Sequence, residues 1–301
     1  MSVPGHVPVM LNEVLEYLAP RPGARFIDAT VNGGGHTAAL LDATAPDGRV
    51  LGIDRDPTII AALHERQAAA VASGRLQLAN DSFAMLAELL PPHLMAEVDG
   101  VLFDLGLSSH HLERSGRGFS FKEDEALDMR FDPTDPACES AADVLAGRDA
   151  NELTDIFRTY GEERFASRIA RTIVSRQKRD PITTTAQLLG AIEQSLPAAA
   201  RWRAGRDAAR IFQALRIVAN DELGAVAAAL PQALDALRPG GRLVVISFHS
   251  LEDRLVKHFL RDQRHAGRVR LLTKRPLLPS DAEIAANPRA ASAKLRAAEK
   301  L

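Results

Sequence analysis

The stretch FIDATVNGGGHTAAL (residues 26–40) decides the fold prediction for this chain. It opens with a short apolar run, continues through Gly33, Gly34 and Gly35, and ends in an alanine-rich segment. This order predicts a buried strand, a tight turn and a helix, and glycine in the turn lets a ligand lie against main-chain N–H groups. The plainer interpretation is a tight turn in which the glycines serve packing alone.

The segments after this stretch repeat its alternation of strand and helix. The predicted strands are residues 25–29, 49–54, 75–80, 98–106 and 242–248, and the predicted helices are residues 36–44, 57–71, 83–92 and 221–237. Such alternation predicts an α/β fold, in which a parallel sheet carries helices on both faces. The carboxyl ends of its strands then share one edge, where ligands bind in open sheets of this kind.

The alternation stops between residues 113 and 210, where only helices and turns are predicted. We therefore expect a discontinuous domain of residues 1–112 and 211–301, with residues 113–210 forming a helical insertion that recognises the substrate. The insertion is polarised in charge, because residues 113–163 hold 14 acidic and 6 basic side chains, whereas residues 164–210 hold 3 and 10. The basic part predicts either a solvated helix face or a contact surface for a polyanion.

Composition limits the class of protein. The chain has 301 residues, is 46% hydrophobic and has a net charge of −2, so the overall charge alone does not indicate nucleic-acid binding. The one cysteine, Cys138, excludes an internal disulfide and fits a reducing compartment. The N-terminus lacks the pattern of a secretory signal, and no apolar run approaches the roughly 18 residues of a membrane helix. We expect a cytoplasmic protein without a membrane partner.

A cofactor is predicted from the spacing of the turn and the next acid. Asp54 ends the second predicted strand about 20 residues after the glycines, where a carboxylate accepts hydrogen bonds from both ribose hydroxyls of a nucleoside. Gly33, Gly35 and Ala38 also satisfy a loose dinucleotide fingerprint, so the spacing leaves NAD and S-adenosylmethionine both open. The later segment ALRPGGRLVVISF (residues 236–248) favours S-adenosylmethionine, because its order of helix, turn and fifth strand is typical of methyltransferase sheets.

Polar side chains follow the fourth and fifth predicted strands. Asp104 ends the fourth strand, with Ser108 and Ser109 just behind it, and His249 follows the fifth strand. Adjacent strand ends that both carry such groups predict one reaction site. Each serine alone is equally typical of a turn or a helix cap. No spacing of His, Cys, Asp or Glu indicates a metal site.

Several longer segments together resemble one family. They include DATVNGGGH (28–36), VLFDLGLSSHHLERSGRGFSF (101–121), LDMRFD (127–132) and SFHSLEDR (247–254), and the resemblance runs from His6 to about Arg296. The chain resembles the bacterial 16S rRNA (cytosine-N4) methyltransferases of the RsmH/MraW family. The resemblance implies a class I S-adenosylmethionine-dependent methyltransferase (Rossmann-like) sheet with an inserted all-helical domain. It also implies methyl transfer from S-adenosylmethionine to the N4 amino group of a cytosine in the decoding region of 16S rRNA.

The same resemblance implies a set of site residues and partners. The expected cofactor contacts are Gly33, Gly34, Gly35, His36, Asp54, Phe83, Asp104 and His111, and the expected catalytic residues are Asp104, Ser108, Ser109 and His249. The expected partner is 16S rRNA within the small ribosomal subunit, and the expected oligomer is a homodimer. The target cytosine must leave its stack to reach such a pocket, with arginine side chains holding the flanking phosphates.

Two departures from the family pattern and three alternatives qualify this interpretation. His111 stands where the family usually has glutamine, and RDAAR (206–210) stands where it usually has HPATR. The alternatives are an NAD-dependent dehydrogenase, a non-catalytic ribosome-binding factor that keeps the fold, and a DNA amino-methylase. The last is the weakest, because no segment predicts its target-recognition domain.

Overall fold

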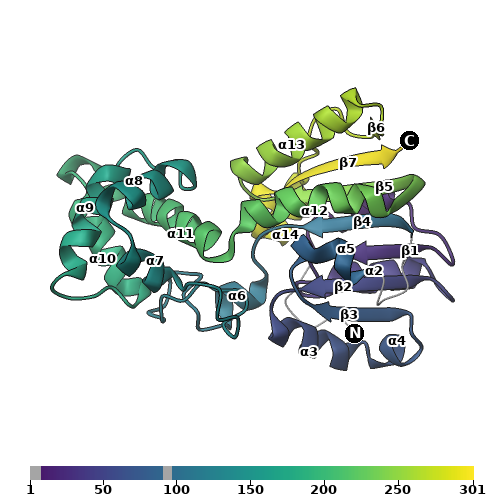
Figure 1. Ribbon diagram of the computed structural model, residues 1–301, viewed down its shortest axis with the longest axis horizontal. Coiled ribbons are helices and arrows are strands. Elements are labelled where there is room, and N and C mark those ends of the chain that lie inside the picture. Colours follow the sequence, from purple (N-terminus) through teal and green to yellow (C-terminus); the bar gives the residue numbers. More distant parts are fainter. Residues whose placement is uncertain (1–7, 91–96) are drawn as a thin grey trace. The chain divides into compact units, whose positions relative to one another are not determined.

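A computed structural model describes residues 8–90 and 97–301, which fall into two compact units (Figure 1). Unit 1 takes the residues up to 108 and from 223 onward, and unit 2 takes residues 109–222. The expected second boundary, between residues 210 and 211, lies inside helix α11 (Ala204–Asn220), which packs on α7, α8 and α10 of unit 2. A helix buries its apolar stripe as one surface, so α11 stays with unit 2 over its full length.

Unit 1 is built on a seven-stranded sheet with the order β3-β2-β1-β4-β5-β7-β6. Strands β1 to β5 run parallel to one another, whereas β7 runs antiparallel to both β5 and β6. The strands are β1 (Arg25–Asp28), β2 (Arg49–Asp54), β3 (Leu76–Asn80), β4 (Val98–Asp104), β5 (Leu237–Ser247), β6 (Val269–Leu271) and β7 (Lys294–Lys300). This sheet with its covering helices confirms the expected class I methyltransferase fold.

Alternating side chains of the strands feed two cores, one on each face of the sheet. Ile27, Leu51 and Phe103 point to the core under α5 (Leu86–Leu89), α12 (Glu222–Ala236) and α13 (Ser250–His265). Their neighbours Phe26 and Val50 point to the opposite core. That core lies under α1 (Leu11–Leu18), α2 (Gly35–Ala43) and α3 (Pro57–Arg66). Burial on both faces explains why these strands read as continuous apolar runs in the sequence.

The end of the chain holds the main departures in unit 1. The expected turn at Pro239–Gly241 is an irregularity within β5, where the pairing with β4 shifts register and Gly240 has a φ of +77°. Strands β6 and β7 were not among the predicted elements. The antiparallel β7 pairs with β5 over six residue pairs, so residues 294–300 extend the sheet beyond β5.

Unit 2 is helical among its described residues. Its helices are α6 (Ser109–Glu113), α7 (Ala141–Gly147), α8 (Ala150–Thr159), α9 (Ala166–Gln177), α10 (Thr185–Ser195) and α11, with the short 3₁₀ helix η2 (Ala198–Arg203) before α11. Three of them begin with a capping box, at Ser140, Asp149 and Thr184. In each box the side chain of the N-cap residue accepts the main-chain N–H of the third helical residue, and the side chain of that third residue accepts the main-chain N–H of the N-cap residue. None of the helices in the described ranges combines the length and apolar character needed to cross a membrane.

The long amphipathic segment 151–177 forms two helices, α8 and α9. The chain turns between them at Gly161, where a Cβ atom would lie 2.8 Å from the carbonyl oxygens of Phe157 and Arg210. Glu162 follows with a left-handed φ of +49°. This close backbone approach requires glycine, so the helix breaks although the apolar periodicity continues.

Candidate active site

The glycine turn of unit 1 is shaped by the protein's own packing. Gly34 has a φ of +76°, and a Cβ atom there would lie 2.6 Å from Cδ1 of Leu63 on α3. A Cβ atom on Gly35 would lie 3.0 Å from the ring of Pro8. Both glycines are therefore required by the fold, and a bound ligand is not needed to explain them. Gly34 is nevertheless the N-cap of α2 and Gly35 its first residue, so their main-chain groups lie at the start of this helix, at the carboxyl edge of the sheet.

Asn32 joins this turn to the ends of two strands. Its own φ is +49°, a left-handed conformation that asparagine tolerates. Its main-chain N–H donates to Oδ2 of Asp54 at 2.9 Å, and its side-chain amide donates to the carbonyl oxygen of Asp104 at 3.0 Å. Through these two hydrogen bonds, Asn32 connects the turn to the ends of β2 and β4.

Asp54 is a fixed acceptor at the end of β2. Besides the bond from Asn32, its Oδ1 accepts the main-chain N–H of Asp56 at 2.9 Å. The residue is only half-buried, and a carboxylate has about four acceptor positions, so the hydroxyls of a ligand can reach it. This arrangement fits the ribose-binding role expected from the sequence.

Asp104 is the most unusual group in the candidate site. It ends β4, is only 6% exposed, and its main-chain N–H donates to the Thr30 hydroxyl at 2.5 Å. Its Oδ2 lies 3.5 Å from Nδ1 of His36, whereas its buried Oδ1 has no hydrogen-bond partner among the described residues. A buried carboxylate oxygen without a partner is costly, so this atom is suited to meet a bound molecule.

His36 indicates where a proton lies in this cluster. Its Nε2 is 3.0 Å from the carbonyl oxygen of Val9, which can only accept, so Nε2 carries the hydrogen. In a neutral ring, Nδ1 is then an acceptor facing Oδ2 of Asp104. Nδ1 of His36 thus faces Oδ2 of Asp104 at 3.5 Å, and the two groups attract each other whenever the imidazole is protonated.

The site contains a second buried acid that the sequence reasoning did not select. Asp28 ends β1 and is fully buried, accepting the Thr37 hydroxyl at 2.6 Å and the Thr30 N–H at 3.3 Å. Burial raises the pKa of Asp28 to about 7, although these hydrogen bonds act to lower it. Its place in FIDAT, directly before the turn, was the available signal, but an acid at a strand end does not by itself reveal its burial.

Neighbouring acids raise the proton affinity of Asp104 further. Burial is the main cause that raises the pKa of Asp104 well above its ordinary value, and the charges of Asp28 and Glu252 act in the same direction. The nearby side-chain amide of Asn32 acts against this shift. Asp104 is thus a carboxyl group that holds a proton more tightly than an ordinary aspartate side chain does.

Other expected residues of unit 1 have structural surroundings that explain their positions. His249 is the N-cap of α13, where its Nδ1 accepts the Glu252 N–H at 3.4 Å and the Glu252 carboxylate accepts the His249 N–H at 3.2 Å. Ser108 is 2% exposed. The Phe83 ring packs edge-on against Phe103 with centroids 5.5 Å apart, so its position is fixed while it stays half-exposed.

Two expected residues belong to unit 2. Ser109 begins α6, and its side chain lies outside the described part of the structure. His111, also on α6, is 3% exposed, and its ring centroid lies 5.1 Å from that of Phe119 and 5.0 Å from that of Phe131. His111 is therefore held in an aromatic cluster of unit 2.

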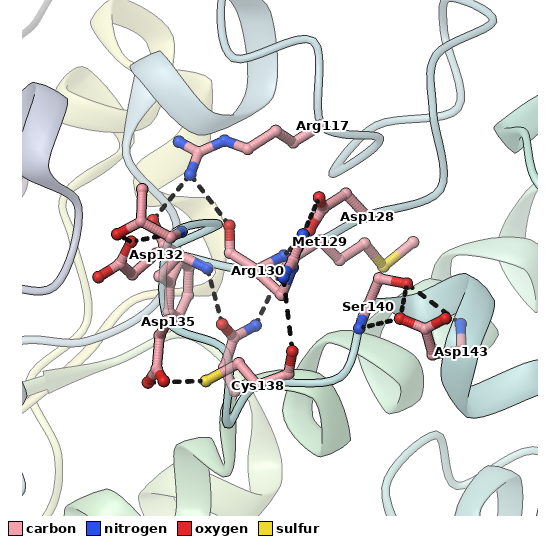
Figure 2. Close-up of polar contacts among 12 residues, drawn as sticks. Arg117, Asp128, Met129, Arg130, Asp132, Asp135, Cys138, Ser140 and Asp143 are labelled. Atoms are coloured by element: carbon pink, nitrogen blue, oxygen red, sulfur yellow. Dashed lines mark hydrogen bonds and ion pairs between the residues drawn. The ribbon is translucent and has the colours of Figure 1, made fainter. Parts of the chain in front are cut away.

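The motifs RGFSF and LDMRFD interlock in the loop that precedes α7 (Figure 2). Arg130 forms a bidentate ion pair with Asp128, with both N–O distances 2.8 Å, and Arg117 donates to the carbonyl oxygens of Arg130 and Phe131 at 3.0 and 2.7 Å. Met129 between them has a φ of +60°. These contacts fix a loop that has no regular secondary structure, and with it the rings around His111.

Comparisons with known proteins agree with this description. Residues 4–301 match the sequence profile of the MraW methylase family. Proteins called ribosomal RNA small subunit methyltransferase H are 46% identical to the chain in Heliobacterium modesticaldum, with 98% of each chain covered, and 49% identical in Thermomicrobium roseum, with 98% of this chain and 94% of that one covered. A solved structure described as a putative rRNA-methylase from Clostridium thermocellum aligns with a TM-score of 0.48 at 14% identity, covering 98% of this chain and all of that one. The length and identity of the sequence matches show that the chain belongs to the MraW methylase family.

Proposed function

We propose that this protein methylates the N4 amino group of a cytosine in the decoding region of 16S rRNA. Its relatives are called ribosomal RNA small subunit methyltransferases, which supports small-subunit rRNA as the substrate. The observation that carries the proposal is Asp104, a buried carboxyl group at the end of β4 with one unpartnered oxygen and a raised pKa. A cytosine amino group is a weak nucleophile, and it needs such an acceptor for its proton.

The cofactor of this methyltransferase is S-adenosylmethionine, which supplies an electrophilic methyl group when bound. In our proposal Asp54 accepts the ribose hydroxyls, and the turn at Gly33–Gly35 faces the cofactor with its main chain. Phe83 offers a ring face to the adenine, supported from its edge by Phe103. The residues fit the cofactor because the fixed Asp54 and the unpartnered Oδ1 of Asp104 both lie at the carboxyl edge of the sheet.

Asp104 orients the target nitrogen and takes up its proton in this proposal. Its Oδ2 faces Nδ1 of His36, whose other ring nitrogen is fixed by Val9, so the carboxyl group is held in place while Oδ1 meets the substrate. Its raised pKa makes the ionised carboxylate a stronger base than an ordinary aspartate. Ser108, Ser109, His249 and His111 remain proposed site residues, with the capping role of His249 sufficient to explain its position.

We assign substrate recognition to unit 2, for which the basic character of residues 164–210 provides support. The flanking nucleotides would be held by their phosphates while the target base is unstacked. The assembled small subunit in the cytoplasm is the proposed substrate, and the relatives' name supports the rRNA of that subunit as the molecule modified.

The test is transfer of labelled methyl from S-adenosylmethionine to naked 16S rRNA and to isolated small subunits, followed by nucleoside analysis. Appearance of N4-methylcytidine is the expected result. A different methylated nucleoside would overturn the cytosine-N4 assignment while leaving RNA methylation intact. Methyl groups found only on protein or DNA would overturn the rRNA assignment as a whole.

A further inference from the structure

We propose that a hollow on unit 2 binds phosphate groups of the RNA backbone. The hollow encloses about 600 Å³ and is formed by α9, the residues directly after it and one residue of α10. Its lining includes the side chains of Arg168, Arg171, Arg176, Arg179, Ser175 and Gln194. The inference rests on the proposed function for the identity of the polyanion, but the site itself is defined by the structure of unit 2.

Helical spacing gathers these arginines on one face. Arg168 and Arg176 are two turns apart, and Arg171 and Ser175 form a parallel row of neighbours four residues apart. Ile169 and Ile173 occupy the buried face of the same helix. The apolar face therefore anchors α9 in unit 2 and directs its cations into the hollow.

The charges of the hollow are unbalanced. Asp180 is its one carboxylate, and it accepts Nη2 of Arg176 at 3.0 Å while Nη1 of Arg176 donates to the carbonyl oxygen of Gln187 at 3.1 Å. The side chains of Arg168, Arg171 and Arg179 form no ion pair with any residue that the structure describes. Several cations around one hollow repel each other, so an anion bound among them is stabilised.

Phosphodiester groups match this lining. Guanidinium groups bind phosphate oxygens through two parallel N–H bonds, and Ser175 adds a hydroxyl donor. Arg176 is held in place by Gln187 and Asp180, while the exposed Arg171 and Arg179 are free to adjust to the course of an RNA backbone. A free nucleotide or inorganic phosphate offers the same chemistry, so the experiment must separate these from RNA.

The test uses the full-length protein with Arg171 and Arg179 both replaced by glutamine. The matched control replaces Arg114 and Arg158, two exposed arginines of unit 2 outside the hollow, so that both variants lose the same charge. Fluorescence anisotropy with a labelled single-stranded RNA is measured over a salt series. We expect the slope of log affinity against log salt to fall by about 1.4 in the hollow variant, about 0.7 for each lost phosphate contact, and little in the control.

The outcomes separate this site from the proposed reaction. Equal losses in both variants would show a diffuse charge effect and overturn the hollow as a site, whatever the methylated product. Tighter competition by adenosine monophosphate or inorganic phosphate than by an RNA of equal phosphate concentration would overturn the RNA backbone as its ligand. If the reaction assay finds no RNA methylation but the hollow variant alone loses RNA affinity, the hollow stands and the proposed function fails.

A separate observation, the exposure of Trp202, leads us to infer a base-stacking position. Trp202 lies on η2 and is 79% exposed, although burying an aromatic side chain is normally favourable. The Arg203 guanidinium lies 6.0 Å from the centroid of its ring and is itself paired with the buried Asp207 at 3.2 Å. An exposed aromatic ring beside arginines is a platform on which an unpaired RNA base can stack.

Trp202 is the chain's one tryptophan, so its fluorescence reports on this position alone. We expect saturating single-stranded RNA to quench its emission and to protect it from acrylamide. Trp202→Leu should weaken RNA binding by about 5- to 150-fold, the range for one stacked base, while Trp202→Phe keeps most of the affinity. Leu278→Ala, which removes another exposed apolar side chain, is the control. Unchanged emission at saturating RNA, together with wild-type affinity of Trp202→Leu, would overturn the stacking role and leave a protein partner as the occupant.

Discussion

Individual residues of the candidate site couple proton binding to stability. Asp28 has a pKa of about 7 in the folded protein and an ordinary value of 3.8, because burial disfavours its charge. The folded state therefore binds the proton more tightly than the unfolded state between these values. Since an acid with a raised pKa stabilises the fold only while protonated, its contribution is fully present below about pH 3.8 and is lost as the pH rises from there through about 7.

Asp28→Asn should remove this dependence. The free energy of unfolding of the variant relative to the wild type should rise between about pH 5 and about pH 8, by at most roughly 3 kcal/mol, since one pKa unit corresponds to about 1.4 kcal/mol. Urea unfolding of the cofactor-free protein at several pH values measures this, with the exposed Asp42→Asn as the control. A constant difference between variant and wild type across the range would contradict the buried-acid assignment.

Asp104 should affect turnover more than cofactor binding. Because its carboxyl group is proposed to accept the amino proton, Asp104→Asn should lower the rate of methyl transfer about 100-fold or more even at saturating cofactor. Single-turnover methylation of small-subunit RNA provides the measurement. A variant with full single-turnover rate would leave Asp104 as a cofactor contact at most.

Asp54 should show the opposite behaviour. Hydrogen bonds to a charged group contribute about 1.5–3 kcal/mol each, so Asp54→Ala should weaken cofactor binding about tenfold or more, and excess cofactor should restore part of the rate. Calorimetric titration with S-adenosylhomocysteine is the direct measurement. The exposed Glu65→Gln on α3 serves as a matched loss of charge. Wild-type affinity in Asp54→Ala would remove this residue from the cofactor site.

At the scale of elements, the end of α11 holds the loop that carries RGFSF and LDMRFD. Asn220 is buried, and its side chain donates to the carbonyl oxygen of Met129 at 2.7 Å and accepts the N–H of Phe131 at 2.8 Å. These bonds replace the regular pairing that the loop lacks. A side chain at a helix end thus determines the backbone course of a distant segment.

Asn220→Ala should leave both backbone groups unsatisfied and lower the free energy of unfolding of unit 2 by about 1–3 kcal/mol. Asn220→Asp keeps the acceptor for Phe131 but loses the donor for Met129, so an intermediate loss is expected. Thermal unfolding and hydrogen exchange of residues 117–143 measure the two effects. Full protection of this loop in Asn220→Ala would show that its other contacts are sufficient.

The elements also show what the sequence can predict. Strands β1 to β5 follow from their apolar runs, since burial on both faces leaves a continuous pattern, and the end of β4 correctly located Asp104. Strand β7 escaped prediction because its sequence KLRAAEK mixes charged with small residues, and its partner β5 is about 50 residues away in the chain. Asp28 was missed because burial depends on contacts from several elements, which local spacing does not contain.

At the scale of the whole molecule, the overall charge of −2 conceals a basic segment in unit 2. Arg201 and Arg206 are exposed, whereas Arg203 is paired with the buried Asp207 and its replacement would disturb the fold. Arg201→Gln with Arg206→Gln should therefore weaken RNA binding and lower the salt slope by about 1.4 without changing stability. Anisotropy titrations with small-subunit RNA, and melting temperatures as the control, test this. An unchanged slope would exclude both arginines from the RNA contact.

The pairing of β4 with β5 has a consequence for how the protein is made. Strand β4 ends at Asp104 and its neighbour β5 begins at Leu237, and the whole of unit 2 lies between them in the sequence. At about 5–20 residues per second, the ribosome needs roughly 7–26 seconds to synthesise the intervening chain. During that interval unit 2 can fold completely, whereas the first four strands of the sheet lack β5, the strand that pairs with β4. A nascent chain in this state exposes the unpaired side of β4, so chaperone capture during translation should concentrate on unit 1.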